Sequence, residues 1–447
     1  MTRHRASLLT LTALAIAPAL GAQASGPQTR PPIRQLGAVH ATTTDSLGMV
    51  NNVRALPGGR LLINDATSRR VLLVDSTFKI ISIVADSTSS TANAYGPRSG
   101  SLIAFRGDST LFVDAASLSM LVIDPAGKIG RVMSVPRSQD AMMLAAGGLG
   151  TGAYYSNGFL VYRGMPGIRM QMSAAGTPTM PSVADTMAIV RVNLQSRAVD
   201  TVGFIKIPKT NTNMTRSDDG KISISIEVNP LPVVDDWVVT SGGDIALIRG
   251  KDYHVDWMSP DGTHRASPKM AFDWKRLSDE QKVALIDSVK AIRDRAAAAN
   301  PGEGNQMAAA FGAALGTGGA AGGAAPQMVM RFEARGGPGG PPGGGAAPQI
   351  MAPQINYVSP SELPDYQPAF FATSAKADDD GNIWIRTIPT KPTPGGAVYD
   401  VVNAKGEVVD RVQIPENRTI VGFGPGGVVI LAARDGMTTT LERARVK

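Results

Sequence analysis

Short apolar runs, separated by turns rich in Gly, Pro, Asn and Asp, follow one another from residue 50 to the end of the chain. Runs of this kind, bounded by turn residues, are typical of β-strands. They group into sets of four, which we expect to begin near residues 52, 102, 152, 237, 373 and 420. The last set lacks a fourth run, and the apolar run at residues 33–41 is left over to supply it.

Two of these sets nearly superimpose, which indicates an internal repeat. The offset between Asp65 and Asp114 equals the offset between Asp75 and Asp124, and similar apolar runs surround each pair. A repeat of about 50 residues built from short β-strands is the signature of a propeller blade. We therefore predict an all-β fold, a six-bladed β-propeller closed by an N-terminal strand, because closure removes the exposed edges of an open array.

Two segments do not fit the blade pattern. Residues 278–297 are predicted to form an inserted amphipathic helix, because Ser278 and Gln281 make a capping box at its start. One apolar stripe would follow this helix, formed by Val283, Ile286, Val289 and Ile292. Residues 298–355 are dominated by Gly, Ala and Pro, a composition that buries too little apolar surface to fold. We expect them to be a disordered low-complexity insertion.

These insertions divide the propeller into two parts. Residues 33–277 contain the closing strand and blades 1–4, and residues 356–447 contain blades 5 and 6.

At the N-terminus, residues 1–24 have the features of a signal peptide: two arginines, a short apolar run and small residues before the cleavage point. An uncleaved membrane anchor is the alternative. Residues 25–32 are predicted to be a flexible leader. The signal peptide indicates a periplasmic or secreted protein.

Composition narrows the possible partners. The absence of cysteine excludes disulfides and a lipid anchor on cysteine. The net charge of +7 comes from Lys and Arg scattered among Asp and Glu, whereas a nucleic-acid footprint needs clustered basic residues. No further stretch is long and apolar enough to span a membrane. We expect a monomer without nucleic-acid partners or a membrane span after signal cleavage, and a partner that is an unknown protein or a small anionic ligand.

The layout resembles the bacterial secreted six-bladed β-propellers, the broad group of NHL-type and TolB-like propellers. Residues 57–65 and 379–386 carry the resemblance, because in both a turn containing Gly precedes an apolar strand. The resemblance covers nearly the whole mature chain except the low-complexity insertion. It implies the propeller fold, but the group includes binding modules, lyases, lactonases and signalling domains, so the function has to come from a site.

No motif points to a cofactor or to catalysis. Gly-x-Ser-x-Gly and the phosphate-binding loop are missing, and His40, His254 and His264 lack the spacing of zinc ligands. We therefore predict no cofactor, no metal site and no catalytic residue. Asp65 and Asp114 follow the second strand of their blades, where we expect them to accept backbone hydrogen bonds in the next turn. Carboxylates that surround a channel metal are the alternative.

One set of residues suggests a binding site. Arg163, Arg249 and Arg386 each end the second predicted strand of blades 3, 4 and 5. Equivalent positions in successive blades would put them on one face of the ring, and converging guanidinium groups favour a carboxylate or phosphate. We take them as the candidate ligand-binding residues. The alternative is that each pairs with a nearby carboxylate, such as Asp252 or Asp400, on an exposed rim.

These observations favour an exported, non-catalytic binding propeller that recognises a protein, peptide or carbohydrate ligand on one face. A metal-dependent propeller hydrolase or lyase is one alternative, and an envelope scaffolding protein is another. Whether the chain is an enzyme stays open at this stage, and we expect that it is not. A metal in the central channel would need carboxylate ligands. The innermost predicted strands at residues 101–105 and 420–423 carry none.

Overall fold

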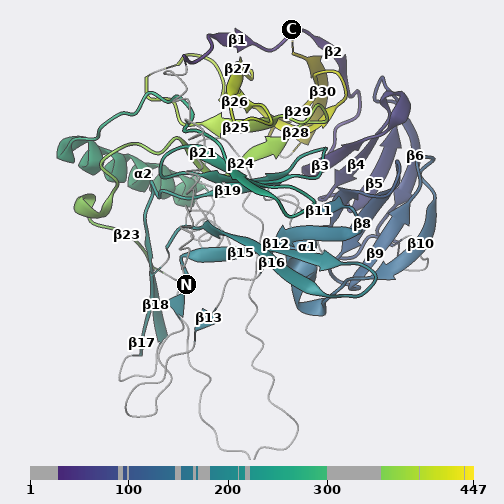
Figure 1. The fold of residues 1–447 in the computed structure, drawn as a ribbon, viewed down its shortest axis with the longest axis horizontal. Coiled ribbons are helices and arrows are strands. Elements are labelled where there is room, and N and C mark those ends of the chain that lie inside the picture. Colours follow the sequence, from purple (N-terminus) through teal and green to yellow (C-terminus); the bar gives the residue numbers. More distant parts are fainter. Residues whose placement is uncertain are drawn as a thin grey trace, which may run out of the picture.

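A computed structural model of the chain describes residues 29–88, 94–97, 100–145, 153–164, 168–169, 182–209, 211–216, 222–299, 354–391, 393–436 and 438–446. It confirms the six-bladed β-propeller, in which six sheets stand around a central axis (Figure 1). The first strand of each blade lies innermost, since these strands contact one another around the ring. The predicted signal peptide lies outside the described residues.

The first three blades are four-stranded. Blade 1 contains, from the axis outward, β3 (Val50–Ala55), β4 (Leu61–Asp65), β5 (Arg70–Val74) and β6 (Ile80–Ala85). Blade 2 contains β7 (Ser101–Ala104), β8 (Thr110–Asp114), β9 (Ser119–Ile123) and β10 (Ile129–Ser134). Blade 3 contains β11 (Tyr154–Ser156), β12 (Phe159–Arg163), β15 (Thr186–Asn193) and β16 (Val199–Lys206).

The other three blades follow the same plan. Blade 4 contains β19 (Asp236–Val239), β20 (Ile245–Arg249), β21 (His254–Met258) and β22 (His264–Ala266). Blade 5 contains β24 (Phe370–Ala377), β25 (Ile383–Thr387), β26 (Val398–Val402) and β27 (Val408–Gln413). Blade 6 contains β28 (Arg418–Gly424), β29 (Val428–Asp435) and β30 (Thr438–Arg445) from the C-terminal part of the chain.

An N-terminal strand completes blade 6, but it is shorter than the predicted closing segment. β2 (Val39–Thr42) pairs antiparallel with β30, with Ala41 opposite Arg443. The preceding strand, β1 (Ile33–Gln35), does not pair with β30 and instead adds a parallel fifth strand to blade 5 beside β27. The N-terminal segment thus crosses from blade 5 to blade 6, next to the C-terminal strands (Figure 1).

A buried ion-pair network holds the start of this segment. Of the predicted flexible leader, residues 29–32 are described, and the guanidinium of Arg30 donates to the carboxylate of Asp400 at 3.2 Å. Arg411 and the hydroxyl of Tyr253 donate to the same carboxylate at 3.2 and 3.0 Å. Asp400 is fully buried. Burial and the charge of this carboxylate both raise the pKa of Tyr253, so its phenol stays a neutral donor.

Apolar side chains fill the spaces between neighbouring blades. Between blades 3 and 4, for example, Val161 and Ile189 pack with Trp237 and Leu247. The side chain of Leu247 is 7% exposed, and the other three are almost fully buried. A fully buried side chain of this size contributes about 1.5–3 kcal/mol. Similar clusters join the other blades, so burial between blades holds the ring together without disulfides.

A small sheet outside the ring was not predicted. Its strands are β17 (Asn211–Arg216), β18 (Ile222–Val228) and β23 (Gln354–Tyr357). The alternation of apolar and polar residues in β18 is a strand signal that sequence reasoning missed. β23 pairs parallel with β18, so the last residues of the predicted disordered insertion lie in a strand. Residues 300–353 of that insertion lie outside the described residues.

The predicted helix is present as α2 (Asp279–Ala299), and its capping box is confirmed. The backbone N–H of Gln281 donates to Ser278 Oγ at 3.3 Å, and the N–H of Ser278 donates to Gln281 Oε1 at 3.1 Å. The predicted single apolar stripe is wrong, because Ile286 is buried while Val283 and Ile292 are exposed. Steps of three residues fall about 60° short of a full turn in a helix of 3.6 residues per turn, so such a series winds around it.

Short elements complete the described chain. They are α1 (Ala141–Ala145), the two-residue strands β13 (Ile168–Arg169) and β14 (Ser182–Val183), and the 3-10 turns Pro57–Gly59, Ser138–Asp140 and Pro360–Glu362. Among the described helices, none is long and apolar enough to cross a bilayer.

Candidate functional site

The ring has two faces, which we define by the strands that end there. On the first face the second strand of each blade ends, as at Asp65, Asp114 and Arg163. On the second face the innermost strand turns into the second strand, as at Pro57–Gly59 and Asp379. All three candidate arginines belong by this definition to the first face.

The structural role predicted for the repeated aspartates is confirmed. Asp65 Oδ1 accepts the backbone N–H of Ser68 at 3.2 Å, and Asp65 Oδ2 pairs with Arg70 at 3.1 Å. Asp114 accepts the N–H of Ala116 at 3.0 Å and a side-chain hydroxyl from the same turn. Both carboxylates are buried and bonded to the turn that follows their strand.

Arg163 and Arg249 face the same space between two blades. Val161 and Leu247, each two residues earlier in the strand, belong to the apolar cluster between blades 3 and 4. Side chains two residues apart in a strand share a face, so both arginines face this space, one from each side. Arg249 is fully paired there, with Asp235 at 2.9 Å and Asp256 at 2.7 Å. It borders a cavity of about 320 Å³.

Arg386 faces a different space. Trp384, two residues earlier, packs in the cluster between blades 5 and 6. The three arginines therefore do not converge on one depression, and this part of the sequence-based hypothesis is wrong. The reason is strand register: a shift of one residue between blades turns a side chain from one neighbouring blade to the other. For Arg249 the alternative of pairing with nearby carboxylates holds, although with partners other than those expected.

Arg163 belongs instead to a group of polar side chains around Asp236, near the first face. Asp236 begins the innermost strand of blade 4 and is 2% exposed. Its carboxylate accepts the backbone N–H groups of Trp237 at 2.9 Å and Ala375 at 2.8 Å. Burial raises the pKa of Asp236 to about 6, against the opposite effects of these hydrogen bonds and of the charge of Arg163. We call Tyr154, Arg163, Asp236 and Lys376 the channel group.

The channel group draws on three blades. Tyr154 lies on the innermost strand of blade 3 and Lys376 on that of blade 5, and both feel the charge of Asp236. Burial lowers the pKa of Lys376 and of Arg163, while the negative charge of Asp236 acts in the opposite direction. Protein thus surrounds these cations, although each keeps some solvent-accessible surface. Sequence reasoning missed Asp236 and Lys376, because nothing in their local sequence marks them as neighbours.

A backbone irregularity lies beside this group. β24 is interrupted by a bulge between Phe370 and Ala375, and within it Thr373 has a φ of 62°. A β-branched residue rarely adopts this left-handed conformation, and such strain persists only where the surroundings hold it. The bulge is directly followed by the Ala375 N–H that binds Asp236. The position of Lys376 in the innermost strand therefore depends on this strained segment.

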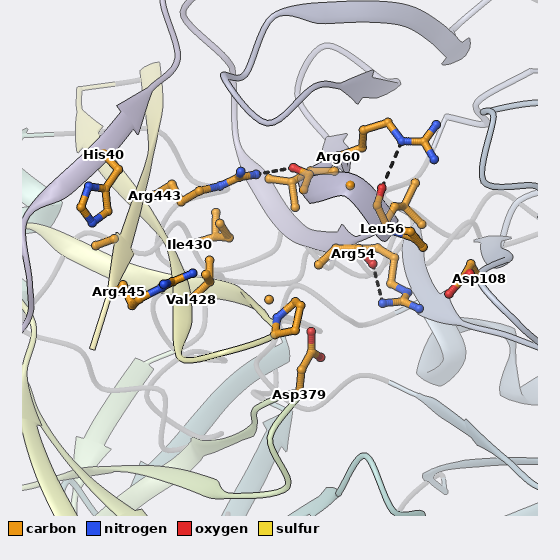
Figure 2. A pocket seen from close by; sticks show the side chains of 18 residues that line it. His40, Arg54, Leu56, Arg60, Asp108, Asp379, Val428, Ile430, Arg443 and Arg445 are labelled. Atoms are coloured by element: carbon orange, nitrogen blue, oxygen red, sulfur yellow. Dashed lines mark hydrogen bonds between the residues drawn. The ribbon is translucent and has the colours of Figure 1, made fainter. Parts of the chain in front are cut away.

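A cavity of about 700 Å³ opens on the second face where blades 6 and 1 meet (Figure 2). We call it the second-face cavity. Its wall includes the turn Pro57–Gly59, where Gly58 and Gly59 have φ values of 75° and 74° that favour glycine. Charged and titratable side chains border it from four blades, namely His40, Arg54, Arg60, Asp108, Asp379, Arg443 and Arg445. Four arginines thus share one cavity with two carboxylates.

The arginines of this cavity are held mainly by backbone carbonyls. Arg443 donates to the carbonyl oxygens of Gly59 at 2.6 Å and Ser76 at 2.9 Å, which ties blade 6 to blade 1. Arg54 donates to the carbonyl of Ala55 at the end of β3, and Arg60 donates to the carbonyl of Pro57 in the turn that follows (Figure 2). Among the described residues, Arg54, Arg60 and Arg443 form no ion pair within 4 Å. Their positive charges are therefore not neutralised by a carboxylate.

Electrostatics in the cavity favour an anion on the arginine side. Burial lowers the pKa of Arg54, opposed by the charges of Asp379 and Asp108, and burial also lowers the pKa of Arg443. Asp379 is exposed, but it stands at the cavity mouth, where partial desolvation raises its pKa in spite of Arg54. Partly desolvated guanidinium groups bind carboxylate or phosphate more strongly than groups in open water.

In the described part of the chain, no three His, Asp or Glu side chains come together in a group that could hold a metal ion.

Neither a protein-family model nor a curated protein matches the sequence. Solved structures do match. A member of the DUF4221 family from Bacteroides vulgatus is 8% identical, with a TM-score of 0.41, and the alignment covers 94% of this chain and 98% of that one.

Two further matches have assigned names. A calcium-binding regucalcin from Agrobacterium tumefaciens is 11% identical with a TM-score of 0.37, over 93% of this chain and 98% of that chain. A virginiamycin B lyase from Staphylococcus aureus is 9% identical with a TM-score of 0.34, over 91% and 100%. At these values the likenesses carry no argument about a site or ligand. The six-bladed fold therefore rests on the sheet topology described above.

Proposed function

We propose that this chain is an exported, non-catalytic binding propeller that holds an anionic ligand in the second-face cavity. The ligand is a carboxylate- or phosphate-bearing part of a protein, peptide or carbohydrate. One observation carries the proposal: Arg54, Arg60, Arg443 and Arg445 border a single cavity of about 700 Å³. The binding role predicted for three other arginines is thus transferred to a different face of the ring.

Cavity size and charge support this assignment. Ligand cavities in proteins have volumes of about 300–1,000 Å³, and they use a few fixed polar groups for orientation. Here the turn Pro57–Gly59 and Val428 supply non-charged wall, and the arginines supply charge-assisted donors. Each hydrogen bond to a charged group is worth about 1.5–3 kcal/mol when it is desolvated. Two or three such bonds give a ligand affinity that is measurable at micromolar concentration.

Binding of a carboxylate series tests the proposal. Titration calorimetry would compare citrate and succinate with the uncharged succinamide, which has the same backbone length as succinate. We expect the two acids to bind and succinamide not to bind. Arg445→Gln should weaken binding about tenfold, because one charge-assisted contact is lost. Arg445 is exposed, so this variant should keep the stability of the wild-type protein.

Arg131→Gln serves as the matched control, since Arg131 is an exposed arginine on the outermost strand of blade 2. Equal binding by the two variants, or equal binding of succinate and succinamide, would contradict the proposal. A pull-down of the mature protein from an envelope extract, followed by mass spectrometry, would then identify the natural partner.

Export, the monomeric state and the relationship to the NHL- and TolB-like propellers belong to the same proposal. The charge and length of residues 1–24 support export, and the repeated pattern of turn, Gly and apolar strand supports the relationship. N-terminal sequencing of the exported protein should begin near Gln23 or Ser25. A mature chain that retains Arg3 would refute signal cleavage.

A further inference from the structure

Three consecutive aspartates, residues 378–380, lie in the turn between β24 and β25, and two of them build that turn. The carboxylate of Asp378 accepts the backbone N–H groups of Asp380 at 3.0 Å and Asn382 at 2.7 Å. The carboxylate of Asp380 accepts the N–H groups of Gly426 at 3.2 Å and Gly427 at 2.8 Å, in the corresponding turn of blade 6. Hydrogen bonds therefore fix this turn of blade 5 both internally and against blade 6.

The middle aspartate, Asp379, has no such role. In the described part of the chain its carboxylate accepts no hydrogen bond and pairs with no cation within 4 Å. It lines the second-face cavity, and so does Asp108, in the turn between β7 and β8 of blade 2. The carboxylate of Asp108 has no bonding partner among the described residues either. Two blades thus bring an unbonded carboxylate to a cavity that four arginines also line.

The arginines of this cavity are held in place but are not fully bonded. Arg443 donates to two backbone carbonyls of blade 1, and its guanidinium lies over the ring of Phe78, 5.2 Å from the centroid. The Nε–H groups of Arg443 and Arg54 are buried and donate to no described atom. In Figure 2, Arg443 and Arg445 lie on one side of the cavity, whereas Arg54 and Asp108 lie on the other. The charged side chains that blade 6 contributes are therefore both cationic, and the carboxylates come from other blades.

This mixed lining restricts the chemistry of the ligand. The charges of both carboxylates act on Arg54, where they oppose the lowering of its pKa by burial. A ligand with only negative charge would be repelled by Asp379 and Asp108 while the arginines attract it. An ammonium group removes this repulsion, because it offers three N–H donors to the carboxylates. Four positive and two negative side chains leave an excess of two positive charges, which favours a ligand with more carboxylates than ammonium groups.

We propose that the second-face cavity recognises an acidic amino acid, either free or as the first residue of a peptide. Its carboxylates bind the arginines, and its ammonium group binds Asp379 and Asp108. This inference rests on the proposed function and narrows it, from an anion in general to a ligand with two carboxylates and one ammonium. The bonds from Asp380 to blade 6 make Asp380 a positioning residue, because they hold the turn that presents Asp379 to the cavity.

L-Aspartate and succinate are a matched pair of probes, because they share one diacid skeleton and differ by the ammonium group. Titration calorimetry on the full mature protein near neutral pH would measure both. We expect L-aspartate to bind about tenfold more tightly than succinate, because it adds a charge-assisted contact. The dipeptide aspartyl-glycine separates the two sources of the ligand. Tighter binding of the dipeptide than of L-aspartate indicates a peptide, and weaker binding indicates the free amino acid.

Asp379→Asn should affect the two probes differently. It weakens the contact with the ammonium group, so L-aspartate should bind about tenfold more weakly. It also removes a repelling charge, so succinate should bind at least as tightly as before. Asp379 is exposed, so the variant should fold, and Asp108→Asn should act in the same direction. Asp185→Asn, at an exposed aspartate of blade 3, is the matched control and should change neither affinity.

Two results would overturn this inference and leave the proposed function in place. One is wild-type protein that binds succinate as tightly as L-aspartate. The other is a preference for L-aspartate that persists when Asp379→Asn and Asp108→Asn are combined. Absence of binding by both probes would overturn the proposed function as well. Arg445→Gln should weaken both probes about equally, because it removes a carboxylate contact that the two share.

Discussion

Replacement of Asp236 by Asn should remove a pH-dependent loss of stability. In the folded protein the pKa of this carboxyl lies at about 6, raised by burial from its ordinary value of 3.8. The folded state therefore holds a proton that the unfolded state releases. Stability from this proton is fully present below about pH 3.8 and is lost as the pH rises through about 6. The amide side chain of the variant carries no charge at any pH.

The size of the effect follows from the shift. At about 1.4 kcal/mol per pKa unit, a shift of about two units corresponds to about 3 kcal/mol of unfolding free energy. Solvent screening does not reduce this value much, because the side chain is 2% exposed. Asn can accept from only one of the N–H groups of Trp237 and Ala375, but this loss is the same at every pH, so the change of the difference with pH isolates the charge. The difference in unfolding free energy between the variant and the wild type should therefore change with pH. Between pH 4 and pH 7 it should shift by about 3 kcal/mol in favour of the variant.

Urea unfolding at half-unit pH steps, followed by tryptophan fluorescence, measures this gap. Trp237 is the next residue and fully buried, so its emission reports on the same blade. Thermal unfolding should show the same trend, with a change of about 3–5 °C for a chain of this length, from about 2.1 cal/mol/K of unfolding entropy per residue. Asp185→Asn, at an exposed aspartate of blade 3, is the control and should give a constant gap. An equally constant difference for Asp236→Asn would refute a buried carboxyl with a raised pKa.

Three more predictions concern the ring itself. Deletion of residues 29–42 should cause aggregation, because it exposes the edge strand β30, and a soluble protein with cooperative unfolding would show that β2 is not needed. Asp400→Ala should lower the unfolding free energy by about 3–5 kcal/mol in urea titrations, because Arg411 and Tyr253 lose their buried partner; a loss below about 1 kcal/mol would contradict the network. Exchange of residues 302–353 for a short Gly/Ser linker should leave the melting temperature nearly unchanged, since their composition supports no core; a drop of more than about 10 °C would disprove this.

Much of the architecture was predictable because each blade is local in sequence. Strands such as β4 and β5 are joined by short turns, and their apolar runs are fully buried on both faces. The repeat containing Asp65 and Asp114 was also interpreted correctly as turn stabilisation, since an Asp at the end of a strand can bond the turn next to it. The helix start at Ser278 was predictable for the same reason.

The candidate site was less predictable. Arg163, Arg249 and Arg386 occupy similar places in their strands, but the side to which a strand residue points depends on register relative to the neighbouring blades. The sequence carries no direct signal for that register. The split of the closing segment between two blades was missed on the same ground, because pairing partners of Ile33 lie near residue 411, at the other end of the chain.

By itself, the sequence determined the all-β composition, the blade repeat, the turns and the helix cap, because each depends on interactions between residues that are near neighbours along the chain. Only the tertiary structure decided which charges meet. Asp236 reaches the strand that carries Lys376 because the innermost strands of blades 4 and 5 lie side by side and the N–H of Ala375 donates to its carboxylate, and Arg54 shares a cavity with Arg443 because the ring closes. Both encounters join residues more than a hundred positions apart. Burial of apolar side chains between blades fixes the geometry of the ring. The polar groups that meet there follow from that geometry and do not determine it.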